Sequence, residues 1–216
     1  MKVTEASRAL FAPGAFLAFA LLGLTIHVPV LAALDRAGAS LLGHGIAVAL
    51  FFTALGRWYA VVAVLAVLVA VYRARGADVR VPLALGLSQA LSQLAVAGLK
   101  LGFGRSRPAH WLVIHEPGFS YPSGHAVTAI VFYGGLVLLV SRARDLPMWA
   151  KLWLVLPAAV CIAGIPWSRL VLGAHYTTDV LGGLFFGAGW LCVTAILGFA
   201  RSRKRFSASA IQHPRA

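Results

Sequence analysis

The chain has 216 residues, of which 60% are hydrophobic and only 12% are charged. Soluble domains carry about 25% charged residues, so this composition excludes an ordinary soluble protein and is typical of a polytopic membrane protein. The formal net charge of +13 would suggest nucleic-acid binding in a soluble protein. Here the basic residues are divided among the segments between apolar runs, and we therefore expect no nucleic-acid partner.

Six apolar segments are long enough, or nearly long enough, to cross a bilayer, which takes about 20 residues at about 1.5 Å per residue. They comprise residues 10–33, 52–72, 82–101, 124–140, 149–167 and 176–199. The first is longer than the roughly 7 to 15 apolar residues of a signal peptide, so we interpret it as a retained span. The fifth contains Pro157 and ends near Pro166, which membrane helices tolerate. We predict an all-α, polytopic membrane protein whose six transmembrane helices form one bundle and a single domain over residues 1–216.

The basic residues alternate in number between the two sides that these spans define. The N-terminus, the second loop, the fourth loop and the tail at 201–216 hold 2, 3, 3 and 5 of the 19 basic residues, and the other loops hold the remaining 6. The positive-inside rule then places both termini in the cytoplasm and loops one, three and five outside. We interpret the basic tail as a topogenic signal rather than a binding site for anionic lipid.

Neither the first external loop nor the two cysteines carry a recognisable motif. The loop, residues 34–51, contains Asp35 and Arg36 among apolar residues. Two interpretations stay open for it: a short amphipathic helix on the membrane surface, or a plain apolar connection. Cys161 and Cys192 each lie within an apolar run, with no CxxC pair and no third thiol. We therefore predict neither a disulfide framework nor a cysteine metal site.

The third external loop begins with two cations. Lys100 stands at the end of the third span, and Arg107 is held by the rigid Pro108 that follows it. Both side chains are hydrogen-bond donors only, which suits the oxygens of an anion. The alternative is that they anchor the helix end at the membrane boundary, with their charged heads in water.

The same loop ends with Tyr121-Pro122-Ser123-Gly124-His125 and leads directly into the fourth span. Ser123 and Gly124 would present backbone N–H groups at a helix N-terminus, where a phosphate oxygen binds readily, and the Ser123 hydroxyl would add another hydrogen bond. His125 follows at the mouth. An imidazole, whose ordinary pKa is about 6.5, suits a general acid that protonates a leaving oxygen. The alternative is a simple N-cap with an incidental histidine.

Residues 168–179, where the sixth span begins, contain Arg169, His175 and Asp179. On a helix, His175 and Asp179 are four residues apart and share a face, so the carboxylate can hold one imidazole nitrogen and direct the other outward as a nucleophile. Arg169 is expected in the preceding loop, where its planar guanidinium suits phosphate oxygens. The alternative is a charge pair at a helix N-terminus with no chemistry.

All three stretches fall on the same side of the membrane by the charge pattern. Together they bring three cations to the two histidines: Lys100, Arg107 and Arg169 around His125 and His175. An anion site beside an oriented imidazole predicts phosphoryl transfer, which depends mainly on positioning and charge neutralisation.

These stretches resemble the tripartite signature of the type-2 phosphatidic acid phosphatase superfamily, which also includes vanadium haloperoxidases. The signature covers residues 100–179 and reads Lys100-x6-Arg107-Pro108, Pro122-Ser123-Gly124-His125 and Ser168-Arg169-x5-His175-x3-Asp179. The resemblance implies that His175 attacks phosphorus and forms a phosphohistidine, that Asp179 orients His175, and that His125 protonates the leaving group. The phosphate-binding residues that it implies are Lys100, Arg107, Ser123, Gly124 and Arg169. Because cationic side chains then take the place of Mg²⁺, we expect neither a metal nor a cofactor.

The expected function is a lipid phosphatase of the bacterial inner membrane, with the lipid bilayer around it and its active site facing the periplasm or outside. Undecaprenyl diphosphate is the predicted substrate, because the chain is compact and has no soluble domain. Phosphatidylglycerophosphate, phosphatidate and a lipid A phosphate are alternatives, since the motifs contact only the phosphoryl group. Two other classes are a lipid-phosphate transporter or flippase, which the near absence of charge within the spans disfavours, and a haloperoxidase.

Two further residues of the catalytic loop, His115 and Glu116, lie outside the signature. They belong either to a solvated loop or to a contact with the lipid head group, although Glu116 would repel an anion unless Arg105 paired with it. The sequence leaves the oligomeric state open.

Overall fold

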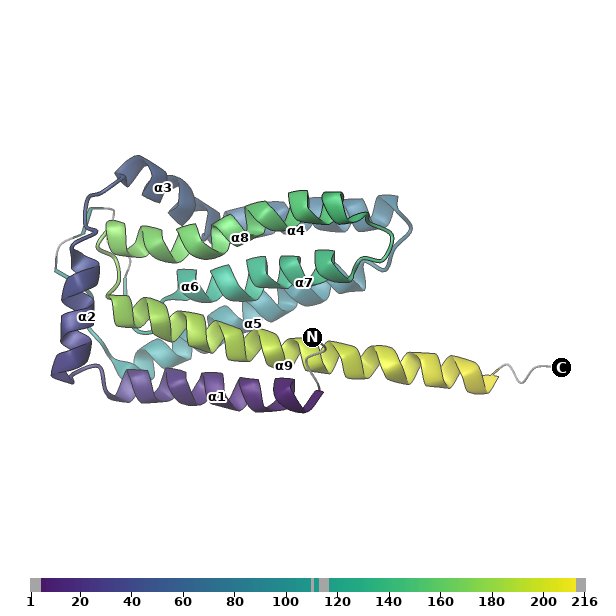
Figure 1. The fold of residues 1–216 in the computed structure, drawn as a ribbon, viewed down its shortest axis with the longest axis horizontal. Coiled ribbons are helices and arrows are strands. Elements are labelled where there is room, and N and C mark those ends of the chain that lie inside the picture. Colours follow the sequence, from purple (N-terminus) through teal and green to yellow (C-terminus); the bar gives the residue numbers. More distant parts are fainter. Residues whose placement is uncertain (1–4, 110, 113–116, 213–216) are drawn as a thin grey trace.

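The computed structural model of the protein describes residues 5–109, 111–112 and 117–212. The described residues form helices and connecting loops and contain no strand, which confirms the predicted all-α class (Figure 1). The helices are α1 (Glu5–Leu24), α2 (Pro29–Ala39), α3 (Ile46–Leu55), α4 (Trp58–Ala74), α5 (Arg80–Phe103), α6 (Gly124–Thr128), the π-helical η1 (Ala129–Tyr133), α7 (Gly134–Arg142), α8 (Met148–Val171) and α9 (Thr177–Gln212). His115 and Glu116 lie outside the described residues.

The last four predicted spans agree with helices that are long and apolar enough to cross a membrane. These are α5, the continuous segment Gly124–Arg142 formed by α6, η1 and α7, then α8, and the first part of α9 at Thr177–Ile196. Two bent helix pairs, α1 with α2 and α3 with α4, bring the total to as many as six if each pair counts as one span. The structure is therefore consistent with the predicted number without fixing it.

The first two predicted spans differ in shape from the prediction. The segment 10–33 is not one helix, because α1 ends at Leu24 and α2 leaves it at an angle of 93°. Pro29 starts α2, where a residue without an N–H fits the first helical turn and cannot continue the preceding helix. The segment 52–72 begins in α3 and bends by 56° before α4, at Gly56 and Arg57.

The first external loop contains helices rather than a plain connection. The end of α2 and the start of α3 fall within residues 34–51, which rules out a plain connection. Figure 1 shows the long helices lying lengthwise and α2 crossing one end of them. There α2 packs against α8 and α9. The residues of α2 thus reach the end of the bundle where α8 and α9 meet.

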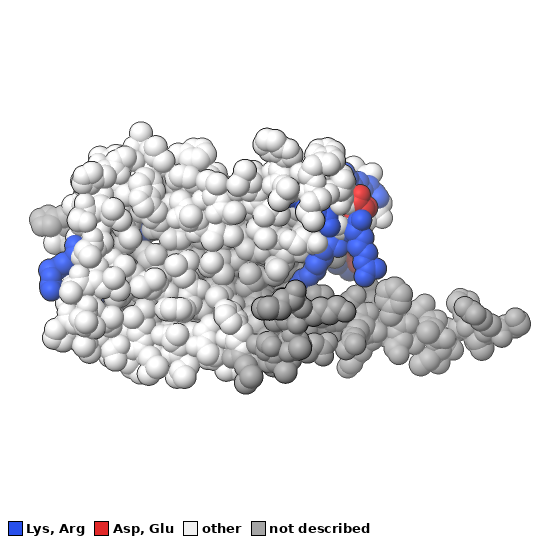
Figure 2. Space-filling view, viewed as in Figure 1, with Lys and Arg blue, Asp and Glu red and all other residues white. Residues whose placement is uncertain are grey.

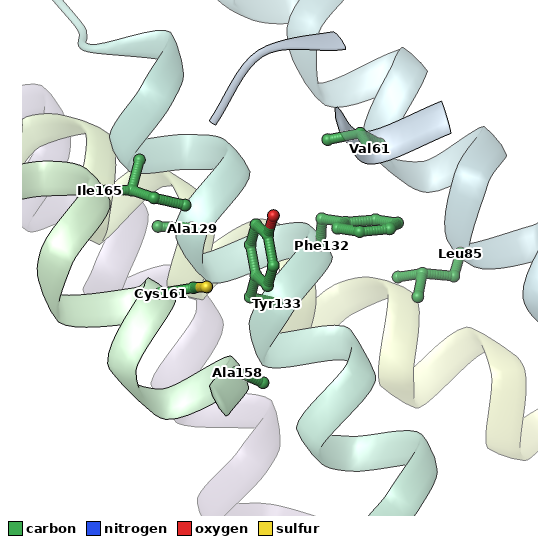
Figure 3. Close-up of a cluster of buried hydrophobic side chains, with 8 residues drawn as sticks. All are labelled: Val61, Leu85, Ala129, Phe132, Tyr133, Ala158, Cys161 and Ile165. Atoms are coloured by element: carbon green, nitrogen blue, oxygen red, sulfur yellow. The ribbon is translucent and has the colours of Figure 1, made fainter. Parts of the chain in front are cut away.

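The buried core is built around the π-helical turn. Phe132 and Tyr133 of η1 pack against α4, α5 and α8 through Val61, Leu85 and Ile165 (Figure 3). The remaining members of this cluster are Ala129, Ala158 and Cys161. Cys161 therefore serves as a small packing residue of this core.

A second core holds the loop that leads into α6. The ring of Tyr121, which is 0% exposed, stacks on Phe19 of α1 at 5.5 Å, and its hydroxyl donates to the Phe19 carbonyl at 2.6 Å. The loop of residues 117–123 is in this way fixed against α1. Because this loop leads directly into α6, it also fixes the position of the first residues of α6.

The outer surface is apolar along its length and charged at its ends. Figure 2 shows Lys and Arg at the two ends of the visible face, with acidic side chains at one of these ends and an almost uncharged region between the ends. Large apolar side chains face outward in that region, including Leu94 at 71% and Trp153 at 72% exposure. At one end an ion pair of 3.4 Å between Arg75 and Asp145 joins the loop after α4 to the loop after α7. Such a surface suits a surrounding of lipid chains.

We expect Gly183→Ala to destabilise the protein by about 1 to 3 kcal/mol, as overpacking does. A Cβ at Gly183 of α9 would lie 2.6 Å from the Ser123 carbonyl oxygen and 2.9 Å from the Ala126 Cβ, so α6 and α9 would have to separate. Thermal unfolding in detergent measures the change. Gly98→Ala in α5 is the matched control, because a Cβ there has nothing within 4 Å. Equal melting temperatures for the two variants would contradict this account of the helix contact.

Candidate active site

The structure brings the three predicted motifs to one end of the bundle, opposite the Arg75–Asp145 pair. Lys100 lies in the last turn of α5, and Ser123 is the N-cap residue of α6. His175 lies between α8 and α9, and Asp179 in the first turn of α9. These positions follow from helix direction, since α5 and α8 end where α6 and α9 begin.

His175 is buried, at 4% exposure, and has a neighbour at each ring nitrogen. Nδ1 lies 3.4 Å from Asp179 Oδ2, and Nε2 lies 3.3 Å from Nη1 of Arg107. Because a guanidinium only donates hydrogen bonds, Nε2 must be the acceptor and Nδ1 must carry the proton. The lone pair of His175 therefore points toward the cations.

The pairing of His175 with Asp179 does not arise in the way that the sequence predicted. His175 precedes α9, which begins at Thr177, so the two residues do not share a helix face. Asp179 Oδ2 instead accepts the backbone N–H of Tyr176 at 2.9 Å, as the third residue of a helix does in a capping box. The carboxylate is thus turned back over the helix start, toward His175.

Arg169 lies in a helix and not in a loop, which corrects the prediction. α8 continues past Pro166 to Val171, and Arg169 is 0% exposed in its last turns. Its Nη1 donates to the hydroxyl of Thr53 in α3, a residue that the motifs do not contain. A tolerated proline inside a membrane helix explains why the expected boundary was too early.

The start of α6 differs from the expected phosphate cradle in one respect. The Ser123 N–H donates to the Asp179 carbonyl at 3.0 Å, so it is not available to an anion in this arrangement. By contrast, Ser123 Oγ and His125 Nε2 are buried and accept or donate no hydrogen bond among the described residues. Buried polar atoms normally have partners. These two atoms are therefore suited to hold a bound ligand.

Two cations are held by backbone carbonyls. Lys100 Nζ donates to the Phe119 carbonyl at 2.8 Å. Arg107 donates through Nε to the Gly118 carbonyl at 3.0 Å and through Nη1 to the Ala174 carbonyl at 3.2 Å. These contacts hold Lys100 and Arg107 against the loop of residues 117–123, and they hold Arg107 also against Ala174, the residue before His175.

The surroundings of His175 favour its neutral form. Burial is the largest cause, followed by the positive charges of Arg169, Lys100 and Arg107, and together they lower the pKa of His175 well below its ordinary value. A neutral imidazole is the form that carries a free lone pair. The site therefore combines a concentrated positive charge with an uncharged nitrogen base.

The sequence did not predict what binds the second carboxylate oxygen of Asp179, Oδ1. Arg105 donates to Asp179 Oδ1 at 2.5 Å and to Asp35 Oδ2 at 2.7 Å. The position of Arg105 two residues before Arg107 was the only signal in the sequence, and the fold alone brings Asp35 of α2 to it. Whether Glu116 also pairs with Arg105 lies outside the described residues.

A cavity of about 710 Å³ opens beside His175, between α2 and the loop of residues 104–109. Its lining includes Asp35, Arg36, Arg105 and Tyr176. Among the described residues, no group of three or more His, Cys, Asp or Glu side chains is placed to hold a metal ion. The arrangement is suited to bind an anion through cationic and neutral donors.

The described residues thus form a bundle of helices long enough to cross a membrane, with a buried imidazole among cations at one end. A family model described as the PAP2 superfamily matches residues 81–203. The chain therefore belongs to the PAP2 superfamily, which confirms the resemblance found in the motifs.

Two relatives and one solved structure illustrate the similarity. Phosphatidylglycerophosphatase B of Bacillus subtilis is 36% identical over 112 residues, which cover 50% of this chain and 52% of that protein. An undecaprenyl-diphosphatase of Sulfolobus acidocaldarius is 26% identical over 148 residues, 68% of this chain and 66% of that protein. The crystal structure of a transmembrane PAP2-type phosphatidylglycerolphosphate phosphatase from Bacillus subtilis matches with a TM-score of 0.76 at 27% identity, over 90% of this chain and 98% of that one. The chain spans about half the length of the first curated relatives that it matches.

We expect Arg107→Gln to raise the pKa of His175 toward the ordinary value of about 6.5. Removing a positive charge 3.3 Å from Nε2 makes protonation of the ring less unfavourable. Histidine ring signals in NMR spectra of the detergent-solubilised protein, assigned with His175→Ala, follow the titration. Arg75→Gln at the opposite end is the control and should leave the titration unchanged. A His175 pKa that stays the same or falls in Arg107→Gln would contradict the charge arrangement described above.

Proposed function

We propose that the chain is an integral-membrane phosphatase that releases phosphate from a lipid phosphate or diphosphate. The observation that supports this most directly is the buried position of His175, whose Nε2 lies 3.3 Å from Arg107 within a group of three cations that lowers its pKa. Such a group would attract a phosphate dianion and hold it against a nitrogen nucleophile. The relatives in the same superfamily are phosphatases by name.

In the first step the lone pair of His175 Nε2 forms a bond to phosphorus. The bond from phosphorus to the lipid oxygen breaks, and its electron pair stays on that oxygen. His125 donates the proton that the oxygen requires, through the Nε2 atom that has no partner within the described chain. A hydrogen bond between the His125 ring and the Thr53 carbonyl occupies the other nitrogen. Asp179 orients His175 and stabilises the positive charge that develops on its ring.

In the second step water attacks the phosphohistidine. The water gives one proton to His125, its oxygen forms a bond to phosphorus, and the bond between nitrogen and phosphorus breaks. Inorganic phosphate and neutral His175 result, and His125 is again protonated for the next cycle. The same residue thus acts as acid and then as base.

The oxygens of the phosphoryl group would be held by charged and polar side chains. The proposed ligands are Lys100, Arg107, Arg169, the Ser123 hydroxyl and the Gly124 backbone. Three positive charges offset the charge that a phosphate dianion brings into a buried site. We therefore propose that the reaction requires no metal ion.

Undecaprenyl diphosphate is the substrate that we propose first, with phosphatidylglycerophosphate as the second candidate. The first is supported by the relative from Sulfolobus acidocaldarius, an undecaprenyl-diphosphatase by name. The second is supported by phosphatidylglycerophosphatase B of Bacillus subtilis and by the solved structure from the same organism, whose names refer to that phospholipid. Phosphatidate and lipid A phosphates share the same phosphoryl chemistry, so they serve as further test substrates.

We also propose that the site faces the outside of a bacterial inner membrane, with both termini in the cytoplasm. The site lies at the end of α5 and α8, whereas Arg73, Arg75, Arg80, Arg142, Arg144 and Lys151 lie at the opposite ends of these helices or in the loops there. By the positive-inside rule that basic end is cytoplasmic.

The purified protein should release phosphate from one of these lipids in the presence of EDTA. His175→Ala should lose essentially all turnover, because the nucleophile is gone, and Asp179→Asn should keep a small fraction. Lipid-by-lipid rates with a phosphate assay provide the measurement, and Asp145→Asn, at the far end of the bundle, is the control. If the folded parent protein releases phosphate from none of the lipids, the phosphatase proposal is wrong, and a lipid-phosphate transporter becomes the better candidate. Turnover that needs an added metal would refute the metal-independent mechanism.

A further inference from the structure

Asp35 is a nearly buried carboxylate that belongs to none of the three motifs. It lies in α2, and its side chain is 10% exposed. Its Oδ1 accepts hydrogen bonds from the Thr178 backbone N–H and the Thr178 hydroxyl, both at 2.9 Å. Its Oδ2 accepts from Nη2 of Arg105 at 2.7 Å. Asp35 thereby fastens α2 to the first turn of α9.

Arg105 carries this contact on to Asp179. While Nη2 binds Asp35, Nη1 donates to Asp179 Oδ1 at 2.5 Å and to the Thr178 hydroxyl at 2.6 Å. The guanidinium also lies over the Tyr176 ring, 4.1 Å from its centroid. With its side chain 12% exposed, Arg105 is held on three sides. A planar fork is the group best suited to bridge two carboxylates in one fixed geometry.

The bridge determines which oxygen of Asp179 faces His175. Arg105 occupies Oδ1, so Oδ2 is left for the Tyr176 N–H and for His175 Nδ1, which lies 3.4 Å away. If Asp35 were neutral, Arg105 would lose one of its two anionic partners, and the Asp179 carboxylate would be held less firmly. An Asp179 that rotates would no longer hold the His175 ring in position.

Charge gives Asp35 a second effect. Two carboxylates and one guanidinium leave a net charge of about −1 behind the imidazole, whereas loss of Asp35 would leave about zero. The groups that face His175 from the other elements are the cations Lys100, Arg107 and Arg169. They oppose any positive charge on its ring. The net negative cluster is therefore what stabilises the ring when its Nε2 becomes bonded to phosphorus.

We propose that Asp35 is a positioning residue of the reaction, acting on His175 through Arg105 and Asp179. This inference rests on the proposed phosphatase function. It assigns to α2, an element outside the signature region, an indirect influence on the rate of phosphoryl transfer. Although Asp35 lines the cavity beside His175, its oxygens accept hydrogen bonds from Arg105 and Thr178, which are not among the proposed phosphate ligands. Substrate binding should therefore depend on Asp35 far less than turnover does.

The test is a kinetic comparison of Asp35→Asn, Asp35→Glu and the control Asp145→Asn. Asp145 is also a carboxylate paired with an arginine, but it is exposed and lies at the opposite end. We expect Asp35→Asn to lower kcat about 10- to 100-fold, as loss of a supporting contact typically does, with KM changed less than about twofold. Asp35→Glu should recover part of the loss, because it restores the charge. An Asp35→Asn enzyme as fast as Asp145→Asn, or one in which only KM changes, would overturn the inference.

A double-mutant cycle separates a positioning role from a merely structural one. In an Asp179→Asn background, Asp35→Asn should lower kcat by less than about twofold more, because the residue through which it acts is already impaired. A full additional loss would show that Asp35 acts by another route and would overturn the proposal. If Asp35→Asn does not fold, Arg105→Lys replaces it, since lysine keeps the charge but cannot bridge both carboxylates with two nitrogens.

A readout without turnover distinguishes failure of this inference from failure of the proposed function. The ¹⁵N signals of the His175 ring report which nitrogen carries the proton. We expect the Nδ1–H form in the parent protein and a smaller share of it in Asp35→Asn, even if no lipid tested is hydrolysed. Ring signals that are identical in the two proteins would overturn the positioning role whatever the activity.

Discussion

The rest of the site depends on the contacts that the Asp179 carboxylate makes. It is 0% exposed and lies in the first turn of α9, where its two oxygens serve different partners. One oxygen binds Arg105, and the other accepts the Tyr176 N–H and faces His175. Its carbonyl also accepts the Ser123 N–H, which ties α6 to α9. A single residue thus contacts His175, the start of α6 and the arginine that bridges to α2.

Lys100, Arg107 and Arg169 are positive charges brought close together in a buried place, where like charges repel one another. Neutral groups are among their partners, namely the carbonyls of Phe119, Gly118 and Ala174 and the hydroxyl of Thr53. Their charge helps to keep His175 in its neutral form. In the proposed reaction the same charges would attract the phosphate before it arrives, which is electrostatic preorganisation. The carboxylates lie on the other side of the imidazole.

The sequence alone predicted the helical class, the location of the later spans and the set of motif residues that meet at one end of the bundle. Motif spacing and apolar length are local properties, and they carry this information well. The remainder depends on tertiary contacts. The turn at Pro29, which brings Asp35 to Arg105, could not be read from hydropathy, because an apolar run continues through it. The helical position of Arg169 and the use of the Ser123 N–H by Asp179 follow from how α8, α6 and α9 pack.

The most direct test of the central claim is to look for the covalent intermediate on His175. A lipid carrying a labelled terminal phosphate is mixed with the purified protein, the reaction is stopped in base, where phosphohistidine survives, and the peptides are analysed by mass spectrometry. The account predicts phosphate on the peptide that contains His175 in the parent protein and none in His175→Ala. Rapid turnover with no phosphate on that peptide, or with phosphate on another residue, would contradict it.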